Sequence, residues 1–222
     1  ENPRSPVSEA FRTLRTNLEF ASVDKPIKTL LIVSAHPGEG KTTIATNLAV
    51  TMAQGGKRVL LIDADLRRPR VHHYLGLTNR VGLSNLFRDT ISIDDVIRPW
   101  GDQGLGVITS GGVPPNPADL LASERMAAIL KAAGKSVDMV IVDAPPFLVA
   151  DASILASRVD GVLLVIRPGK TPVDAAMTTL EQMRRAGANI LGVVLNRIPR
   201  NRPNYYGGYR HYSGYYKGEY GY

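Results

Sequence analysis

Residues 35–42 constrain the fold of this chain most strongly, because they read AHPGEGKT between an apolar run at 29–34 and a helical stretch at 41–54. Glycines at positions 38 and 40 allow backbone N–H groups to approach an anion closely. A helix that begins beside such a loop directs the positive end of its dipole toward the same anion. The segment matches the pattern of a phosphate-binding loop, with Ala35 where the general pattern has glycine.

The lysine and the hydroxyl residue of such a loop have separate tasks. Lys41 is expected to reach the β- and γ-phosphates of a nucleoside triphosphate, and Thr42 to place its hydroxyl on Mg²⁺. The sequence therefore predicts ATP and Mg²⁺ as ligands. The predicted nucleotide-binding residues of the loop are Pro37, Gly38, Glu39, Gly40, Lys41, Thr42 and Thr43.

Short apolar runs rich in Val, Ile and Leu alternate with helical stretches along the chain. Most of these runs lack the alternation of a half-exposed strand, which favours a parallel sheet covered on both faces. The order predicts a doubly wound α/β fold that binds ligands at the carboxyl ends of its strands. The predicted strands are 29–34, 58–62, 105–109, 137–142, 161–166 and 190–195, and the helices between them are 41–54, 123–133, 151–157 and 172–186.

Two of the predicted strands end in aspartates. Asp63 and Asp65 follow one strand, and Asp143 follows another. Oxygen ligands suit Mg²⁺, which takes one or two carboxylates and keeps several waters. Asp143 is thus the predicted metal carboxylate, bound directly or through water. Asp63 and Asp65 are candidates for a second metal contact or for a general base.

The amino-terminal residues predict one amphipathic helix. Ser5 can cap it and Pro6 suits its first position. Its apolar face is formed by Val7, Phe11, Leu14 and Leu18, beside a polar stripe of Glu9, Arg12 and Arg15. Charged residues at this spacing often form only a solvated, salt-bridged surface.

Composition excludes some classes of protein. The chain has no cysteine, so it has no disulfide, no thiolate metal site and no thiol nucleophile. An iron–sulfur electron carrier is excluded for the same reason. No apolar run approaches the ~18 residues that span a membrane, and the segment itself is expected to be soluble.

The carboxyl-terminal residues differ in kind from the rest. Residues 201–222 lack aliphatic side chains and are expected to be disordered or to order on a partner. Eight of the nine tyrosines lie there: Tyr205, Tyr206, Tyr209, Tyr212, Tyr215, Tyr216, Tyr220 and Tyr222. The chain carries a net charge of +7, and a basic tail of this kind can contact nucleic acid, anionic lipid or an acidic partner, or simply remain solvated.

Three segments, 35–43, 60–69 and 140–146, resemble the Walker A, Walker A′ and Walker B motifs of bacterial tyrosine kinases, which belong to the MinD- and ParA-like branch of P-loop NTPases. The likeness extends from about Ser5 to Arg197 and includes Glu9-x-x-Arg12-x-x-Arg15, the segment PPNPADLL at 114–121 and the tyrosine-rich tail. The full chain is similar to the cytoplasmic kinase domain of capsule and exopolysaccharide assembly proteins.

The resemblance implies ATP-dependent phosphorylation of tyrosines on the protein's own tail. It assigns activation of the tyrosine hydroxyl to Asp63, phosphate binding to Lys41, Mg²⁺ to Thr42 and Asp143, and support of the metal site to Asp65. It also places Asn196, followed by Arg197, at the nucleotide base. It divides the chain into an oligomerisation helix at 1–22, a kinase domain at 23–199 and a flexible acceptor tail at 200–222.

The resemblance also implies partners and a location. Subunits of the family form homo-oligomeric rings in which a tail enters a neighbour's active site. The resemblance implies that Glu9, Arg12 and Arg15 form the oligomerisation motif. A membrane-embedded activator segment, in the same chain or a separate one, and a cognate tyrosine phosphatase are expected, and no specific nucleic acid. The expected location is the cytoplasmic face of the membrane. Rival hypotheses are a MinD- or ParA-like switch ATPase without kinase activity and an ATP-gated scaffold.

Overall fold

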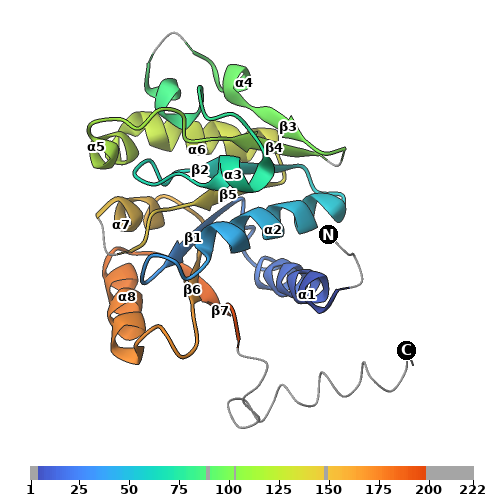
Figure 1. Ribbon diagram of the computed structural model, residues 1–222, viewed down its shortest axis with the longest axis vertical. Helices are drawn as coiled ribbons and strands as arrows, with labels where there is room; N and C mark the ends of the chain where they lie inside the picture. Colours follow the sequence, from blue (N-terminus) through green and yellow to red (C-terminus); the bar gives the residue numbers. More distant parts are fainter. Residues whose placement is uncertain (1–4, 89–90, 103, 148–149, 199–222) are drawn as a thin grey trace.

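The computed structural model describes residues 5–88, 91–102, 104–147 and 150–198. Their strands form one seven-stranded sheet in the order β3-β4-β2-β5-β1-β6-β7, seen through the centre of Figure 1. All neighbouring strands are parallel except β3, which runs antiparallel to β4. The strands are β1 (Thr29–Ser34), β2 (Val59–Asp63), β3 (Arg98–Trp100), β4 (Leu105–Ile108), β5 (Met139–Asp143), β6 (Gly161–Ile166) and β7 (Ile190–Leu195).

Helices cover both faces of the sheet. One face packs against α1 (Pro6–Ala21), α2 (Lys41–Gln54) and α3 (Val71–Leu75), and the other against α5 (Pro117–Ala122), α6 (Glu124–Ser136), α7 (Ala150–Ala156) and α8 (Val173–Arg185). Two further short elements, the 3₁₀ helix η1 (Leu83–Phe87) and α4 (Ile93–Val96), pack on the second face. This is the doubly wound, mostly parallel α/β fold that the sequence predicts.

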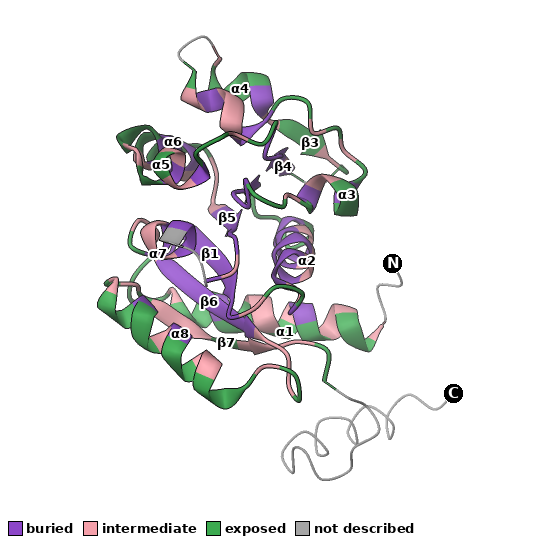
Figure 2. Ribbon diagram, turned by 60° about the vertical axis from the view of Figure 1, so that its left-hand side comes forward, coloured by how far each residue is buried: buried purple, intermediate pink, exposed green. Residues whose placement is uncertain are grey.

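The central strands are buried on both sides, as Figure 2 shows for β1, β5 and β6. Successive residues of β1 alternate between the two cores: Leu30 and Ile32 face α2, whereas Leu31 and Val33 face the opposite layer. Burial on two faces explains why the sequence shows continuous apolar runs instead of alternation. The parallel pairing of β2 and β1 with β5 brings the carboxyl ends of these three strands side by side at one edge of the sheet.

The predicted elements are confirmed with small shifts at their ends. The bounds of β1, β6, β7 and α2 agree with the prediction, and β2 and β5 begin one or two residues later than predicted and include Asp63 and Asp143. Five elements of at most six residues each have no counterpart among the predicted elements: β3, α3, η1, α4 and α5.

The predicted amino-terminal helix is α1. Ser5 caps it, accepting the N–H of Ser8, and Pro6 stands in its first turn. Phe11 and Leu18 are buried against α2, but Val7 is 55% exposed, so the apolar face is covered only in part. No helix among the described residues is both long and apolar enough to cross a membrane. The predicted acceptor tail, residues 200–222, and its eight tyrosines lie outside the described residues.

Candidate functional site

The phosphate-binding loop joins β1 to α2 and depends on two glycines with positive φ. Gly38 has φ +83° and Gly40 has φ +98°, a region that side chains other than glycine rarely adopt. A Cβ atom at Gly40 would also lie 2.1 Å from the side-chain amide nitrogen of Asn196. The second glycine is therefore required by its conformation and by a neighbour from the end of β7.

Asn196 and Glu39 hold the loop against the rest of the sheet. The Asn196 amide donates to the backbone carbonyl of Glu39 at 2.8 Å. The buried Glu39 carboxylate accepts the His36 N–H at 2.9 Å and the hydroxyl of Thr171. Both residues belong to the predicted nucleotide-binding set, and in the structure their side chains fix the shape of the loop.

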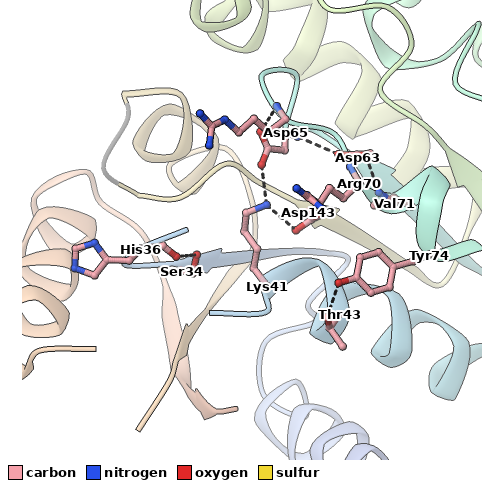
Figure 3. A network of polar contacts seen from close by, with 11 residues as sticks. Ser34, His36, Lys41, Thr43, Asp63, Asp65, Arg70, Val71, Tyr74 and Asp143 are labelled. Atoms are coloured by element: carbon pink, nitrogen blue, oxygen red, sulfur yellow. Dashed lines mark hydrogen bonds and ion pairs between the residues drawn. The ribbon is translucent and has the colours of Figure 1, made fainter. Parts of the chain in front are cut away.

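The ammonium group of Lys41 lies between two carboxylates (Figure 3). Its distance is 2.8 Å to Asp65 and 3.5 Å to Asp143. All three side chains are nearly or fully buried. The structure thus brings together the predicted phosphate-binding lysine and two of the three predicted carboxylates, although they come from three separate motifs.

Asp63 lies behind this group and contacts the backbone. One of its oxygens accepts the N–H groups of Arg70 and Val71 at 3.1 and 3.0 Å, and the other accepts the N–H of Asp65 at 3.2 Å. These bonds order the loop between β2 and α3. Asp65, in contrast, reaches the surface of the cleft beside the phosphate-binding loop.

Burial and charge change the proton affinities of these groups. Burial, and then the nearby Asp143, raise the pKa of Asp63 to about 8. Burial also raises the pKa of Asp143. For Lys41, burial lowers the pKa, but the carboxylates of Asp143 and Asp65 outweigh it and raise the pKa above its ordinary value. Lys41 is therefore held in its charged form, as a phosphate ligand must be.

The oxygen donors at the loop fit Mg²⁺. One oxygen of Asp143 is buried without a hydrogen-bond partner among the described residues, and the nearby Thr42 side chain lowers the pKa of the same carboxyl group. Within the described ranges, no group of three or more His, Asp or Glu residues could hold a metal by itself. Such a partial donor set suits Mg²⁺, whose remaining ligands are waters and substrate phosphates.

The cleft at this edge has a volume of about 640 Å³. Its lining includes Pro37, Gly38, Gly40, Lys41, Thr42, Asp65 and Arg197 from the predicted set. It also includes Arg67, Arg68, Arg70 and Tyr74, which the sequence analysis did not assign. Their position directly after the Asp63 and Asp65 strand end was the available signal. Thr43 is tied to this wall, since its hydroxyl lies 3.1 Å from that of Tyr74.

The predicted oligomerisation residues lie away from the cleft, on α1. Arg12 forms an ion pair with Glu9 at 2.6 Å, with both side chains about 40% exposed. Arg15 donates to the carbonyl of Thr51 at 3.1 Å and so binds α1 to α2. Arg12 and Arg15 border a second hollow of about 710 Å³, which shares Tyr74 with the first.

The sequence is similar to a family of P-loop NTPases and to proteins named as tyrosine-protein kinases. Residues 26–204 match the ParA family model, described as NUBPL iron-transfer P-loop NTPase. The chain is 47% identical over 208 residues to the tyrosine-protein kinase YwqD of Bacillus subtilis, covering 93% of this chain and 88% of the relative. It is 37% identical to the putative tyrosine-protein kinase CapB of Staphylococcus aureus, covering 93% and 92%. It is 40% identical to the tyrosine-protein kinase Etk of Escherichia coli, and the match covers 89% of this chain but only 27% of the relative.

Solved structures give the same result. The kinase domain of Etk from Escherichia coli superposes with a TM-score of 0.87 at 39% identity, covering 94% of this chain and 83% of that one. The chimerical protein CapA2B2 gives 0.86 at 38% identity, covering 90% and 88%. The cell-division ATPase MinD of Pyrococcus furiosus gives a lower 0.68 at 28% identity, covering 78% and 73%.

Proposed function

This chain belongs to the bacterial tyrosine kinases of the ParA family of P-loop NTPases, and we propose that it transfers the γ-phosphoryl group of ATP to tyrosines of its own carboxyl-terminal segment. The observation that carries the proposal is the Lys41, Asp65 and Asp143 group beside the phosphate-binding loop, in a chain with eight tyrosines after residue 204. Phosphoryl transfer depends mainly on positioning and charge stabilisation, which such a group supplies.

Different residues of the cleft would bind the phosphates, the metal ion and the base of the nucleotide. Lys41 and the N–H groups of residues 38–43 would hold the phosphates of ATP, while Thr42 and Asp143 would hold Mg²⁺, with Asp65 supporting the site. Mg²⁺ would neutralise charge on the phosphate oxygens. Asn196 and Arg197 border the base. Asn196 is tied to the loop carbonyl of Glu39, which supports its place at the nucleotide.

In the reaction, the tyrosine oxygen bonds to the γ-phosphorus as the bond to the leaving ADP oxygen breaks, and the phenol proton passes to a carboxylate. Family resemblance assigns that carboxylate to Asp63. Its pKa, raised to about 8, means that Asp63 binds a proton more tightly than an ordinary carboxylate does. Asp65 is the second candidate, because it lines the cleft whereas Asp63 bonds to three backbone N–H groups.

We also propose that the chain forms a homo-oligomer. Residues 1–22 would serve as the oligomerisation helix, 23–199 as the kinase domain and 200–222 as the acceptor tail. The exposed Glu9 and Arg12 pair on α1 supports docking on a second copy. The tail would then be phosphorylated in trans, within a homo-oligomeric ring. A length of 26 residues, 197–222, can extend up to roughly 85 Å and so reach a neighbour.

The names of similar proteins support a function in capsule or exopolysaccharide systems. The chimerical protein CapA2B2 and the EpsB kinase of Ralstonia solanacearum are similar to this chain. We infer a membrane-embedded co-polymerase partner that activates the kinase at the cytoplasmic face of the membrane. The kinase and a cognate tyrosine phosphatase would then regulate capsule or exopolysaccharide polymerisation and export.

Intact mass spectrometry tests the central claim. The full chain with Mg²⁺ and ATP should gain steps of about 80 Da, roughly one per phosphate, that map to residues 205–222. Lys41→Met should gain none. If ATP is hydrolysed without added mass, even with the cytoplasmic segment of a membrane activator present, the chain acts as a switch ATPase and the proposal is wrong.

A further inference from the structure

One wall of the active-site cleft carries more positive charge than the nucleotide loop requires. The lining residues Arg67, Arg68 and Arg70 come from the loop between β2 and α3. Arg67 is bound to the buried Asp151 at 2.7 Å. The side chains of Arg68 and Arg70 are exposed and have no hydrogen bond or ion pair to another described residue.

The backbone beneath these two arginines is fixed. The N–H of Arg68 donates to Asp65 at 3.0 Å, and the N–H of Arg70 donates to Asp63 at 3.1 Å. The same carboxylates stand at the end of β2, so the arginine wall keeps its position relative to the reacting groups. Guanidinium groups that extend from such a backbone can bind phosphate oxygens through paired hydrogen bonds.

The acceptor segment has the wrong charge for this wall before the reaction and the right charge afterwards. Residues 197–222 contain five basic residues and one acidic residue, so the unmodified segment is repelled by Arg68 and Arg70. Each phosphotyrosine adds about −1.5 to −2. Tyr206, Tyr209, Tyr212 and Tyr215 repeat every three residues, which separates neighbours by about 10 Å in an extended chain.

We propose that Arg68 and Arg70 form a phosphotyrosine subsite beside the acceptor position, so that the kinase prefers a tail segment that already carries phosphate near the reacting tyrosine. This rests on the proposed transfer to the tail and adds an order to it. The first phosphorylation of a tail is slow, and later ones on the same tail are faster.

Binding of peptides tests the subsite without turnover. The full chain, with the eight tail tyrosines changed to Phe, is titrated with Mg²⁺ and ADP present against labelled peptides of residues 203–217. Fluorescence anisotropy compares a peptide phosphorylated at Tyr209 with the unmodified peptide. The phosphopeptide should bind about tenfold more tightly, the gain of one charge-assisted contact. Equal affinities would overturn the subsite.

Variants assign the preference to the two arginines. Arg68→Gln with Arg70→Gln should reduce the affinity ratio to near one. The control pair Arg80→Gln with Arg184→Gln makes the same charge change at two exposed positions outside the cleft lining and should keep the ratio. A ratio unchanged in the first pair, or lost equally in both pairs, would overturn the assignment. Weakened binding of Mg²⁺ and ADP in the first pair alone would show that the arginines serve the nucleotide.

Kinetics separate this inference from the function on which it rests. With ATP, the phosphopeptide should show a lower KM at its remaining tyrosines than the unmodified peptide. If both peptides are phosphorylated with equal KM, the kinase assignment stands and the subsite is wrong. If the wild-type chain phosphorylates neither peptide nor its own tail, the acceptor assignment is wrong, and anisotropy still decides the subsite.

Discussion

The ammonium nitrogen of Lys41 lies 2.8 Å from a carboxylate oxygen of Asp65, so the lysine that we propose to bind phosphate is already paired with a residue of another motif. Phosphates therefore compete with Asp65 for Lys41. The same carboxylate holds the N–H of Arg68 and thereby connects the nucleotide loop to the arginine wall.

Replacing Asp65 should separate nucleotide binding from transfer. In Asp65→Asn, Lys41 loses its nearest competitor, and ADP without metal should bind at least as tightly as in the wild type. Tyrosine phosphorylation should fall by about 100-fold, the usual cost of removing a charged group that positions a reaction. Isothermal titration calorimetry and phosphotyrosine blotting give the two values. Weaker ADP binding together with normal phosphorylation would contradict this reading of the contact.

Two glycines of the loop should respond differently to alanine. Gly38→Ala meets only an unfavourable φ, because nothing lies within 4 Å of the new Cβ, and should cost about 1–2 kcal/mol. Gly40→Ala adds a collision with Asn196 and should cost more. Asn196→Ala in the Gly40→Ala background should return the loss to the level of Gly38→Ala. Urea unfolding measures all four proteins, and equal losses for both glycine variants would contradict the collision.

Replacing Arg12 or Arg15 of α1 should affect oligomerisation and thermal stability to different extents. The Glu9 and Arg12 ion pair is exposed and contributes little to folding, so Arg12→Ala should reduce the oligomer with a nearly unchanged Tm. Arg15 binds the Thr51 carbonyl and covers Gly55, so Arg15→Ala should lower the Tm. Analytical ultracentrifugation and thermal melts compare them with Thr13→Ala, an exposed control on the same helix. An oligomer unchanged in Arg12→Ala would remove this residue from the interface.

Acid should weaken a clamp between the starts of β2 and β5. The side chain and then the backbone N–H of Arg58 donate to Asp138 and lower the pKa of its carboxyl well below the ordinary value of 3.8. A carboxylate favoured in the folded state stabilises it above its unfolded pKa and loses that effect as the pH falls. The stability difference between wild type and Asp138→Asn should be full above about pH 5 and shrink toward pH 3. Urea midpoints across this range measure it, and a constant difference would contradict the clamp.

Sequence patterns predicted the parts of the fold that depend on local periodicity and on burial. The strands β1, β6 and β7 were placed to the residue because each is a continuous apolar run ended by polar or turn residues. Short elements such as β3 and α4 were missed, since three or four residues carry too little periodicity and are held by tertiary contacts. The antiparallel pairing of Pro99 with Gly106 depends on an edge position that no local pattern reveals.

The predicted site residues divide in a similar way. Lys41 and Thr42 were predicted from the phosphate-binding loop motif, in which the position of each residue determines its role. The different contacts of Asp63 and Asp65 were not predictable. Residues two apart in a strand face the same side, but Asp65 lies beyond the end of β2 at Asp63, where the loop backbone sets the direction of its side chain. The arginines of the β2–α3 loop were overlooked because charged residues after a strand usually have no role beyond solvation.

The position of Arg197 affects how the rate of tail phosphorylation depends on protein concentration. This residue lines the cleft, and Tyr205 follows it by eight residues, a reach of at most about 28 Å. A segment joined at the rim of a site is presented to it at an effective concentration that can reach the millimolar range, set by chain length alone. A subunit that dilution releases from the proposed ring is therefore left with its own tail as acceptor, whereas a subunit within the ring also has its neighbour's tail.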